Sequence, residues 1–267
     1  MADTKRIVII ADMHCGHRAG LTPPQYRHAA GDDHIWQKYT RVAEEAWGLY
    51  AEEARRLVPI DCLVVNGDAI DGRGEKSGGC EALTVDRNEQ CKIAIECIKL
   101  WEAPKIYMTR GTPYHAGDIE SWEDSVAEKV GAKIGDHEWV DVNGYIFDVK
   151  HFVGGSQIPH GRYTAVARDA LWNSLWAEAL DQPRADMIVR SHVHYCITGS
   201  NWSGEKHREF LVTPALQAMG TRFGAQRMSG IVTWGLVAFD IDTEGRIAWR
   251  HYGIHRLDAT RATASRV

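Results

Sequence analysis

The segment RIVIIADMH, residues 6–14, joins a run of β-branched and apolar residues to two side chains that can bind a metal ion. The run Arg6–Ala11 predicts a buried β-strand, and Asp12 and His14 follow it directly. An apolar run followed by carboxylate, hydroxyl or imidazole side chains occurs four more times in the chain. These runs and the polar residues after them are Leu63–Val65 with Asp68, Ile106–Met108 with Thr112 and His115, Ile146–Val149 with His151, and Met187–Val189 with His192 and His194.

The positions of these polar side chains predict that they meet at one place. In open α/β sheets, the loops that follow the carboxyl ends of parallel strands converge at one edge of the sheet. Asp12 and His14, like His192 and His194, are two residues apart. This spacing places both side chains of each pair on the same side of an extended chain. We therefore expect the five segments to offer their ligands to a single focus.

The chemistry of the set indicates transition metals. A mixture of carboxylates and imidazoles suits manganese, iron or zinc better than calcium or magnesium. Two such ions about 3.5–4 Å apart can hold a phosphoryl group and convert a bound water into hydroxide near neutral pH. Asp68, in the middle of the set, is a carboxylate that both ions can share. The sequence thus predicts a binuclear centre with two divalent ions, manganese first and iron or zinc as alternatives.

These motifs resemble those of the calcineurin-like metallophosphoesterases, whose pattern is D-x-H, G-D-x-x-D, G-N-H-D/E, a lone His and G-H-x-H, in that order. The corresponding segments are Asp12-Met13-His14, Gly67-Asp68-Ala69-Ile70-Asp71, Gly111-Thr112-Pro113-Tyr114-His115, His151 and Ser191-His192-Val193-His194. The resemblance implies an α/β fold in which a two-sheet β-sandwich is flanked by α-helices, in four αββα layers. It also implies two ligand sets, which are Asp12, His14, Asp68 and His194 for the first metal, and Asp68, His151 and His192 for the second.

The third motif departs from the family pattern. Thr112 stands where the family has an asparagine ligand, and its hydroxyl oxygen reaches roughly 1 Å less far from the backbone. Pro113 is expected to hold Thr112 extended. Either Thr112 replaces the asparagine as a metal ligand, or the second metal site is weak. His115 lies two positions later than the family's histidine and can act as a general acid on the leaving group. His115 and the shared Asp68 are the predicted catalytic residues.

Other residues near the motifs allow more than one interpretation. Ser191 stands where the pattern has glycine, a change between small residues that we expect to be tolerated. Asp71 either orients a metal ligand from behind or caps the loop that follows it. The candidate substrate contacts are Arg73, Arg110, Arg162 and His17, the last of which is as readily placed in solvent. The loop 220–227, with two arginines around an aromatic ring, either binds single-stranded nucleic acid or is ordinary surface.

Periodicity predicts the rest of the fold as a single domain over residues 1–256, with a flexible C-terminal tail at 257–267. Helices are expected at 36–57, after Asp86, at 121–130 and at 162–180, the last with Trp172 and Trp176 facing the core. Asn143-Gly144 predicts a type I′ hairpin turn. A second hairpin is expected to pair residues 234–241 with 247–252.

Composition excludes several classes of protein. The 267 residues are 44% hydrophobic and 25% charged, which is unlike a disordered chain. The net charge of −5 gives no bulk positive field for nucleic acid or membranes, which leaves a local basic patch as the remaining alternative. No stretch reaches membrane-spanning length, and the N-terminal apolar run is too short for a signal peptide. Six cysteines without C-x-x-C spacing indicate reduced thiols and a cytoplasmic location.

The expected function is that of a metal-dependent phosphoester hydrolase, a metallophosphoesterase that uses a metal-bound hydroxide. A phosphodiesterase or nuclease-like activity is favoured, because nothing in the chain resembles the extra elements of protein phosphatases. The alternatives are a phosphomonoesterase, acting on proteins or small molecules, and a binding scaffold whose site has lost its chemistry. The expected partner is a phosphate ester, with nucleic acid or a nucleotide as candidates and no membrane. The oligomeric state stays open.

Overall fold

The structure is a computed structural model that describes residues 4–27, 34–117, 121–203, 206–219, 230–262 and 264. Its first sheet has six strands in the order β11-β10-β1-β2-β3-β4. Four strands run parallel, namely β1 (Lys5–Ile10), β2 (Cys62–Asn66), β3 (Ile106–Thr109) and β4 (Lys133–Gly135). The antiparallel hairpin β10 (Trp234–Ile241) and β11 (Ile247–His255) continues the sheet beyond β1. The loops after β1, β2 and β3 therefore lie at the same edge of the sheet.

The second sheet has five strands in the order β5-β6-β7-β9-β8. Its centre is parallel and consists of β6 (Tyr145–Val149), β7 (Met187–Arg190) and β9 (Lys206–Val212). Antiparallel strands β5 (Glu138–Val142) and β8 (Ile197–Ser203) close its two sides. The loops after β6 and β7 carry the remaining predicted ligands.

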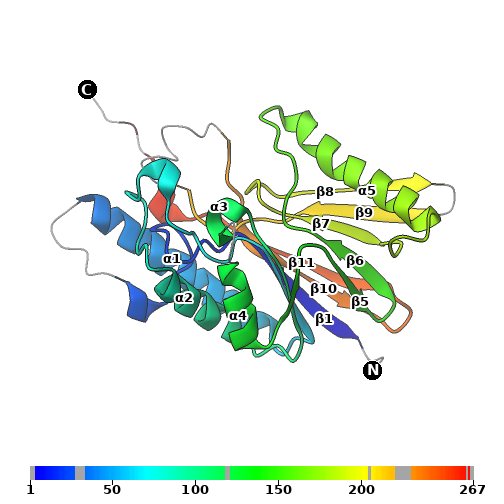
Figure 1. Ribbon diagram of the computed structural model, residues 1–267, viewed down its shortest axis with the longest axis horizontal. Helices are drawn as coiled ribbons and strands as arrows, with labels where there is room; N and C mark the ends of the chain where they lie inside the picture. The colour runs from blue at the N-terminus through cyan, green and yellow to red at the C-terminus, as the bar shows by residue number, and fades with distance from the viewer. Residues whose placement is uncertain are drawn as a thin grey trace.

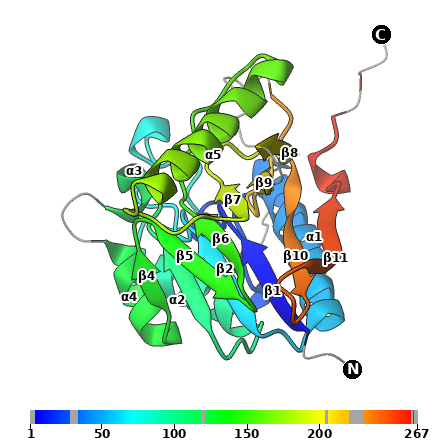
Figure 2. The ribbon, with the colours of Figure 1, turned by 90° about the vertical axis from the view of Figure 1, so that its right-hand side faces the viewer.

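Helices cover the outer faces of both sheets. On the outer face of the first sheet lie α1 (His34–Leu57), α2 (Arg87–Lys99) and α4 (Trp122–Val130), and on that of the second sheet lies α5 (Arg162–Glu178) (Figure 1). The short α3 (Pro113–Ala116) and the 3₁₀ helices η1 (Pro24–Tyr26), η2 (Glu75–Ser77), η3 (Pro159–Gly161) and η4 (Asp258–Thr260) lie in connections. The predicted αββα layers are confirmed, and Figure 2 shows them from a second side.

The two sheets share one apolar core. Side chains along β1 alternate between two clusters, because successive residues of a strand point to opposite faces. Val8 and Ile10 pack with the helices, whereas Ile7 and Ile9 pack in the cluster that contains Phe147 of the second sheet. All four β1 side chains are fully buried, so the strand that carries the first motif is fixed from both sides.

Most predicted elements are present, with boundaries close to those expected. Asn143 and Gly144 both have positive φ, as a type I′ turn requires, and the Asp86 side chain caps α2 by accepting the N–H of Asn88. Strands β4 and β8 were not predicted. The expected core position of Trp172 and Trp176 is wrong, because both side chains are about half exposed on the outer side of α5.

The part of the chain expected to be a tail begins with packed residues. Leu257 is buried in the core under α1, and the backbone N–H groups of Asp258 and Ala259 donate to the carboxylate of Glu45 on that helix. The division into one domain and a tail stays a prediction. Among the described residues, no helix combines the length and the apolar character needed to cross a bilayer.

Candidate metal centre

The backbone is left-handed at most of the predicted ligand positions. Asp12, His14, Asp68, His192 and His194 have φ between 43° and 74°. Only three other non-glycine residues in the described part of the chain share this rare conformation. The expectation that Asp12–His14 and His192–His194 are extended pairs is therefore wrong, since each chain turns sharply at its ligands. Such concentrated backbone strain is a feature of functional sites.

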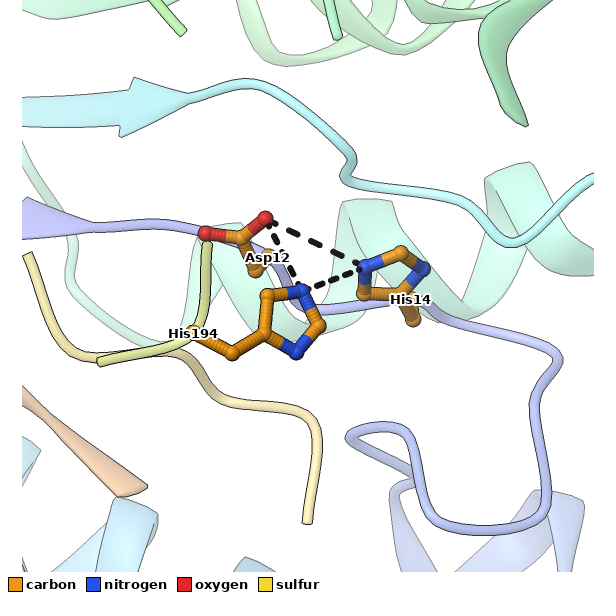
Figure 3. A group of neighbouring side chains, drawn as sticks. All are labelled: Asp12, His14 and His194. Carbon is orange, nitrogen blue, oxygen red and sulfur yellow. Dashed lines mark hydrogen bonds and ion pairs between the residues drawn. The ribbon is translucent and has the colours of Figure 1, made fainter. Parts of the chain in front are cut away.

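The first ligand cluster consists of Asp12, His14 and His194 (Figure 3). The Nε2 atom of His194 lies 3.3 Å from Asp12 Oδ1 and 3.3 Å from His14 Nε2, and His14 Nε2 lies 3.9 Å from the same Asp12 oxygen. One ligand atom from each side chain thus faces the same small volume. Asp12 and His14 follow β1 in the first sheet, and His194 follows β7 in the second.

The second cluster consists of Asp68, His151 and His192. Asp68 Oδ2 lies 3.1 Å from His151 Nε2 and 4.0 Å from His192 Nδ1. The same oxygen is 3.9 Å from His14 Nε2 of the first cluster. Asp68 therefore lies between the two clusters, where a carboxylate shared by two ions would be. The structure brings together all six of the predicted carboxylate and imidazole ligands.

The ligand atoms are buried and influence one another's ionisation. Burial opposes protonation of His151, but Asp68 and Asp12 outweigh it and raise the pKa of His151 to about 10, so a metal ion would have to displace the proton of this ring. Asp12 Oδ1, His151 Nε2 and His192 Nδ1 are buried without a hydrogen-bond partner in the described structure. Burial, with help from neighbouring His115, lowers the pKa of His14 to about 4, so its ring is neutral. Burial opposes ionisation of Asp68, but His151 and His192 outweigh it and hold the pKa of this carboxyl well below its usual range. Buried unpaired polar atoms are costly, and divalent cations would satisfy these.

Two histidines are oriented through their other ring nitrogen. His151 Nδ1 donates to the carbonyl oxygen of Asn66 at 2.7 Å, which leaves Nε2 to the cluster. His14 Nδ1 is 3.1 Å from Asp71 Oδ1. A carboxylate behind a histidine fixes the ring and its tautomer in metal sites. Of the two interpretations of Asp71, the structure supports the one in which it orients a ligand.

The third motif lies against the shared carboxylate. Thr112 has the extended conformation expected before Pro113, with φ −70° and ψ 142°. Its N–H donates to Asp68 Oδ1 at 2.7 Å, and its hydroxyl lies 3.2 and 3.3 Å from the two Asp68 oxygens. His115 belongs to a third group of ligand atoms, with His14 and Asp68. Its Nδ1 donates to the carbonyl oxygen of Asp71 at 2.6 Å.

The four candidate substrate contacts differ in their surroundings. Arg162 lines a cavity together with His192 and His194. Arg73 is exposed on the loop whose Gly72 packs closely against the backbone of His115. The loop 220–227 lies outside the described residues.

Two of these contacts are already engaged elsewhere. Arg110 forms ion pairs with Asp124 and Asp136. The ring of His17 is 7% exposed, with Nδ1 accepting the N–H of Ala19 and Nε2 3.5 Å from Glu81. In this conformation both side chains have protein partners, and His17 is buried rather than in solvent. Their role as substrate contacts stays a prediction.

Sequence reasoning missed a hydrogen-bonded row beneath the ligands. Thr109 donates to Asn66 Oδ1 at 2.6 Å, and Asn66 Nδ2 donates to Ser191 Oγ at 2.6 Å. Ser191 in turn pairs with Thr213 at 2.7 Å. The four residues end β2 and β3 or follow β7 and β9, so the row joins both sheets. The serine that replaces the family's glycine thus supplies a link that glycine cannot make.

Glu123 is a second residue to which no motif pointed. This fully buried α4 side chain accepts the N–H groups of Ala69 at 2.7 Å and Gly111 at 2.6 Å. It therefore fixes the loops that carry Asp68 and Thr112. Burial, reinforced by nearby Asp68, raises the pKa of Glu123 to about 7.

Comparisons with known proteins give similarity in structure only. No protein-family model and no curated protein sequence matches the chain. A protein of unknown function from Aquifex aeolicus has 15% identity and a TM-score of 0.38, covering 72% of this chain and 80% of that one. A Thermotoga maritima protein has 14% identity and a TM-score of 0.39, covering 95% and 99%. NAD nucleotidase from Haemophilus influenzae has 12% identity and a TM-score of 0.46, covering 94% of this chain and 50% of that protein.

The architecture and the ligand clusters are those that the resemblance to the calcineurin-like metallophosphoesterases implies. What the chain does is inferred below from its own side chains.

Proposed function

We propose that this protein is a metal-dependent phosphoester hydrolase that acts on phosphodiesters. The observation that carries the proposal is the pair of ligand clusters joined by Asp68. The ligand atoms of these clusters face one another and are buried, and three of them have no hydrogen-bond partner in the described structure. Asp12, His14, Asp68 and His194 would hold one divalent ion, and Asp68, His151 and His192 the other. When bound, such a pair of ions supplies a nucleophile from water near neutral pH and neutralises charge on the phosphoryl group.

The side chains around the clusters supply orientation and a proton. Asp71 and the Asn66 carbonyl hold the rings of His14 and His151, so the ligand atoms are in place before an ion arrives. Hydrolysis forms a bond from phosphorus to a water oxygen and breaks the ester P–O bond, and the leaving oxygen takes up a proton. In its doubly protonated form, His115 can give that proton from Nε2 while its Nδ1–H stays bonded to the Asp71 carbonyl.

The placement of His115 and of one exposed aromatic ring suits a phosphate ester with an alkoxide leaving group and an aromatic substituent. An alkoxide leaving group needs a proton donor, and the ring of His115 packs edge-on against that of His14 at 4.5 Å between centroids. Phe152, which is 57% exposed, lies 4.9 Å from the ring of His192. An exposed ring beside the centre can stack on a nucleobase or another aromatic substituent. A nucleotide or nucleic-acid ester is therefore the favoured class of substrate.

The Asp68→Asn variant tests the proposal. Wild-type protein loaded with manganese should bind two ions per chain and hydrolyse bis-p-nitrophenyl phosphate faster than p-nitrophenyl phosphate. Asp68→Asn should bind fewer ions and lose at least about 100-fold in kcat, since even residues that only support metal ligands cost 10–100-fold. Asp181→Asn, at an exposed position, is the matched control and should behave like wild type. A wild-type protein that hydrolyses neither compound with manganese, iron or zinc would leave the scaffold interpretation instead.

A further inference from the structure

A cavity of about 310 Å³ adjoins the metal centre on the side of the second sheet. His192 and His194 form part of its wall, and its other polar side chains include Arg162, Tyr195, Gln157 and Gln217. Its volume is at the lower end of the range found for ligand pockets. A group bound there would be a direct neighbour of a phosphate held at the ligand clusters.

The side chains of this cavity favour an anion. None of the described residues that line it carries a carboxylate. Tyr195 is only 7% exposed, and its hydroxyl has no hydrogen-bond partner in the described structure. Arg162 Nε is likewise buried and unpartnered, and the guanidinium lies 4.5 Å from the centre of the Tyr195 ring, which holds it in place. Arg162 is also the first residue of α5, whose first turn contains no acidic side chain.

We propose that the cavity binds a second phosphate group of the substrate, next to the phosphate that is hydrolysed. This inference rests on the proposed function and narrows its substrate class to esters with two phosphates, such as a nucleotide chain. Guanidinium, phenol and carboxamide groups all donate hydrogen bonds, which matches the several acceptor oxygens of a phosphate. A hydrogen bond to a charged group is strong enough that losing it should cost about tenfold or more.

Dinucleotides with and without an extra terminal phosphate test the cavity. Thymidine dinucleotides phosphorylated at the 5′ or the 3′ end are compared with the unphosphorylated TpT. Manganese-loaded wild type should show about tenfold higher kcat/KM for one phosphorylated form. Arg162→Gln should abolish that preference, and Arg162→Lys should partly restore the preference. Arg246→Gln, at an exposed arginine in the β10–β11 turn, is the control.

Binding of the same dinucleotides is measured in parallel, which separates the two proposals. Hydrolysis without any preference for a terminal phosphate, or a preference that survives Arg162→Gln, would overturn the cavity assignment. Tight binding of the phosphorylated dinucleotide that depends on Arg162, without hydrolysis of any ester, would overturn the proposed function and leave the cavity assignment standing.

A second observation, independent of the metal centre, concerns the outer face of α5. The inner side of this helix buries Val166, Ala170 and Asn173. Its outer side exposes four large apolar side chains, Leu171, Trp172, Leu175 and Trp176, each between 44% and 57% exposed. Figures 1 and 2 show no described helix or strand over this side of α5. A contiguous exposed apolar patch of this kind marks an interaction surface.

The sequence of α5 indicates what covers this patch. Leu171 and Leu175 lie two residues on either side of Asn173, and Arg168 and Glu178 lie five residues on either side. The spacings of three and four residues place these four side chains on one face of the helix. Two copies of α5, packed antiparallel about the level of Asn173, would oppose Leu171 with Leu175 and Arg168 with Glu178. The face is thus complementary to itself in both apolar contact and charge.

We infer that α5 forms an isologous interface with a second copy of this chain, in which each contact occurs twice about a two-fold axis. Arg168 would pair with Glu178 of the partner subunit, and the tryptophans would be buried beside the leucines. Glu178 already accepts a hydrogen bond from Arg184, so two arginines would share this carboxylate at the interface.

Charge exchange across α5 tests this interface. Light scattering of the full chain should give the mass of a dimer at micromolar concentration, and Leu171→Asp should give a monomer. Arg168→Glu and Glu178→Arg should each weaken the dimer about tenfold by placing like charges opposite each other. The double variant Arg168→Glu/Glu178→Arg, which restores opposite charges, should regain the dimer affinity of the wild type. A wild type that is monomeric at 100 µM, or a dimer that neither single variant weakens, would overturn the inference.

Discussion

Thr112 is the position at which this chain departs most from the family pattern, and its hydroxyl lies against both oxygens of Asp68. If that hydroxyl ligates the second ion or holds the shared carboxylate, Thr112→Val should weaken binding of one manganese ion by about 10–100-fold. Thr112→Ser keeps the hydroxyl and should bind both ions like wild type. Titration with manganese, monitored by calorimetry, measures the two affinities. Equal affinities in the valine and serine variants would show that the hydroxyl plays no part.

The role of His115 can be separated from that of the ligands by the leaving group. A p-nitrophenolate leaves without a proton, whereas the alkoxide of TpT needs one. His115→Gln should therefore lower kcat for TpT by about 10²–10⁴-fold and affect bis-p-nitrophenyl phosphate far less. His160→Gln, at an exposed position, serves as the control. If His115→Gln slows both esters equally, His115 acts as a ligand or a structural residue, consistent with its place beside His14 and Asp68.

At the scale of elements, the sequence predicted the buried apolar strands and the two hairpins better than the short or polar strands. The parallel strands β1, β2 and β7 contain continuous apolar runs, because they are buried on both faces. Strand β8 (ITGSNWS) is polar and β4 is three residues long, so neither has the periodicity of a buried strand. The tryptophans of α5 follow a helical spacing that does not distinguish a core from an interface, which is why their exposure was not foreseen.

Because of the contact between α1 and β11, we expect the free energy of unfolding to depend on pH. Glu53 of α1 is 3% exposed and accepts hydrogen bonds from His251 at 2.8 Å and His255 at 2.7 Å on β11, with Arg56 at 4.0 Å. Burial opposes ionisation, but the bonds from His255 and His251 prevail and lower the pKa of Glu53 below its ordinary 4.5. Because the folded pKa is depressed, the stabilisation is present above pH 4.5 and is lost as the pH falls through the folded value.

Glu53→Gln measures that contribution. At neutral pH the variant should be about 1.5–3 kcal/mol less stable than wild type, since it loses hydrogen bonds to a charged group. The difference between the two unfolding free energies should shrink as the pH falls below 4.5. Urea unfolding followed by tryptophan fluorescence at several pH values provides the data. The neighbouring Glu52→Gln, at an exposed position, should show no such pH-dependent difference, and a constant gap for Glu53→Gln would contradict the assignment.

For the whole molecule, the ligands of the candidate site could be predicted, because they follow strand ends in a fixed order. The residues that hold those ligands in place could not be predicted. Asp12, Asp68 and His151 are recognisable because each follows a short apolar run that predicts a strand. The row through Asn66 and Ser191, and the clamp of Glu123, join residues whose proximity depends on how the two sheets pack. The left-handed backbone at the ligands is also a property of the assembled site. Aspartate and histidine adopt this conformation more often than most non-glycine residues but still uncommonly, so residue type alone does not predict it at these positions.

Because the site is assembled from both sheets, we expect the stability of the molecule to depend on metal. Asp12, His14 and Asp68 follow strands of the first sheet, whereas His151, His192 and His194 follow strands of the second. Ions bound between them would link the sheets in the folded chain only. Manganese at 100 times its dissociation constant should then stabilise the fold by about 2.7 kcal/mol.

For a chain of this size, that stabilisation corresponds to a rise in Tm of roughly 5–10 °C. Calorimetric scans in manganese and in EDTA measure the shift. Asp68→Asn should lose most of the shift, because it weakens the carboxylate that both ions share, whereas the exposed Asp181→Asn should keep it. Identical Tm values for wild type in manganese and in EDTA would mean that these side chains hold no ion, since a bound ion that bridges the sheets must oppose their separation.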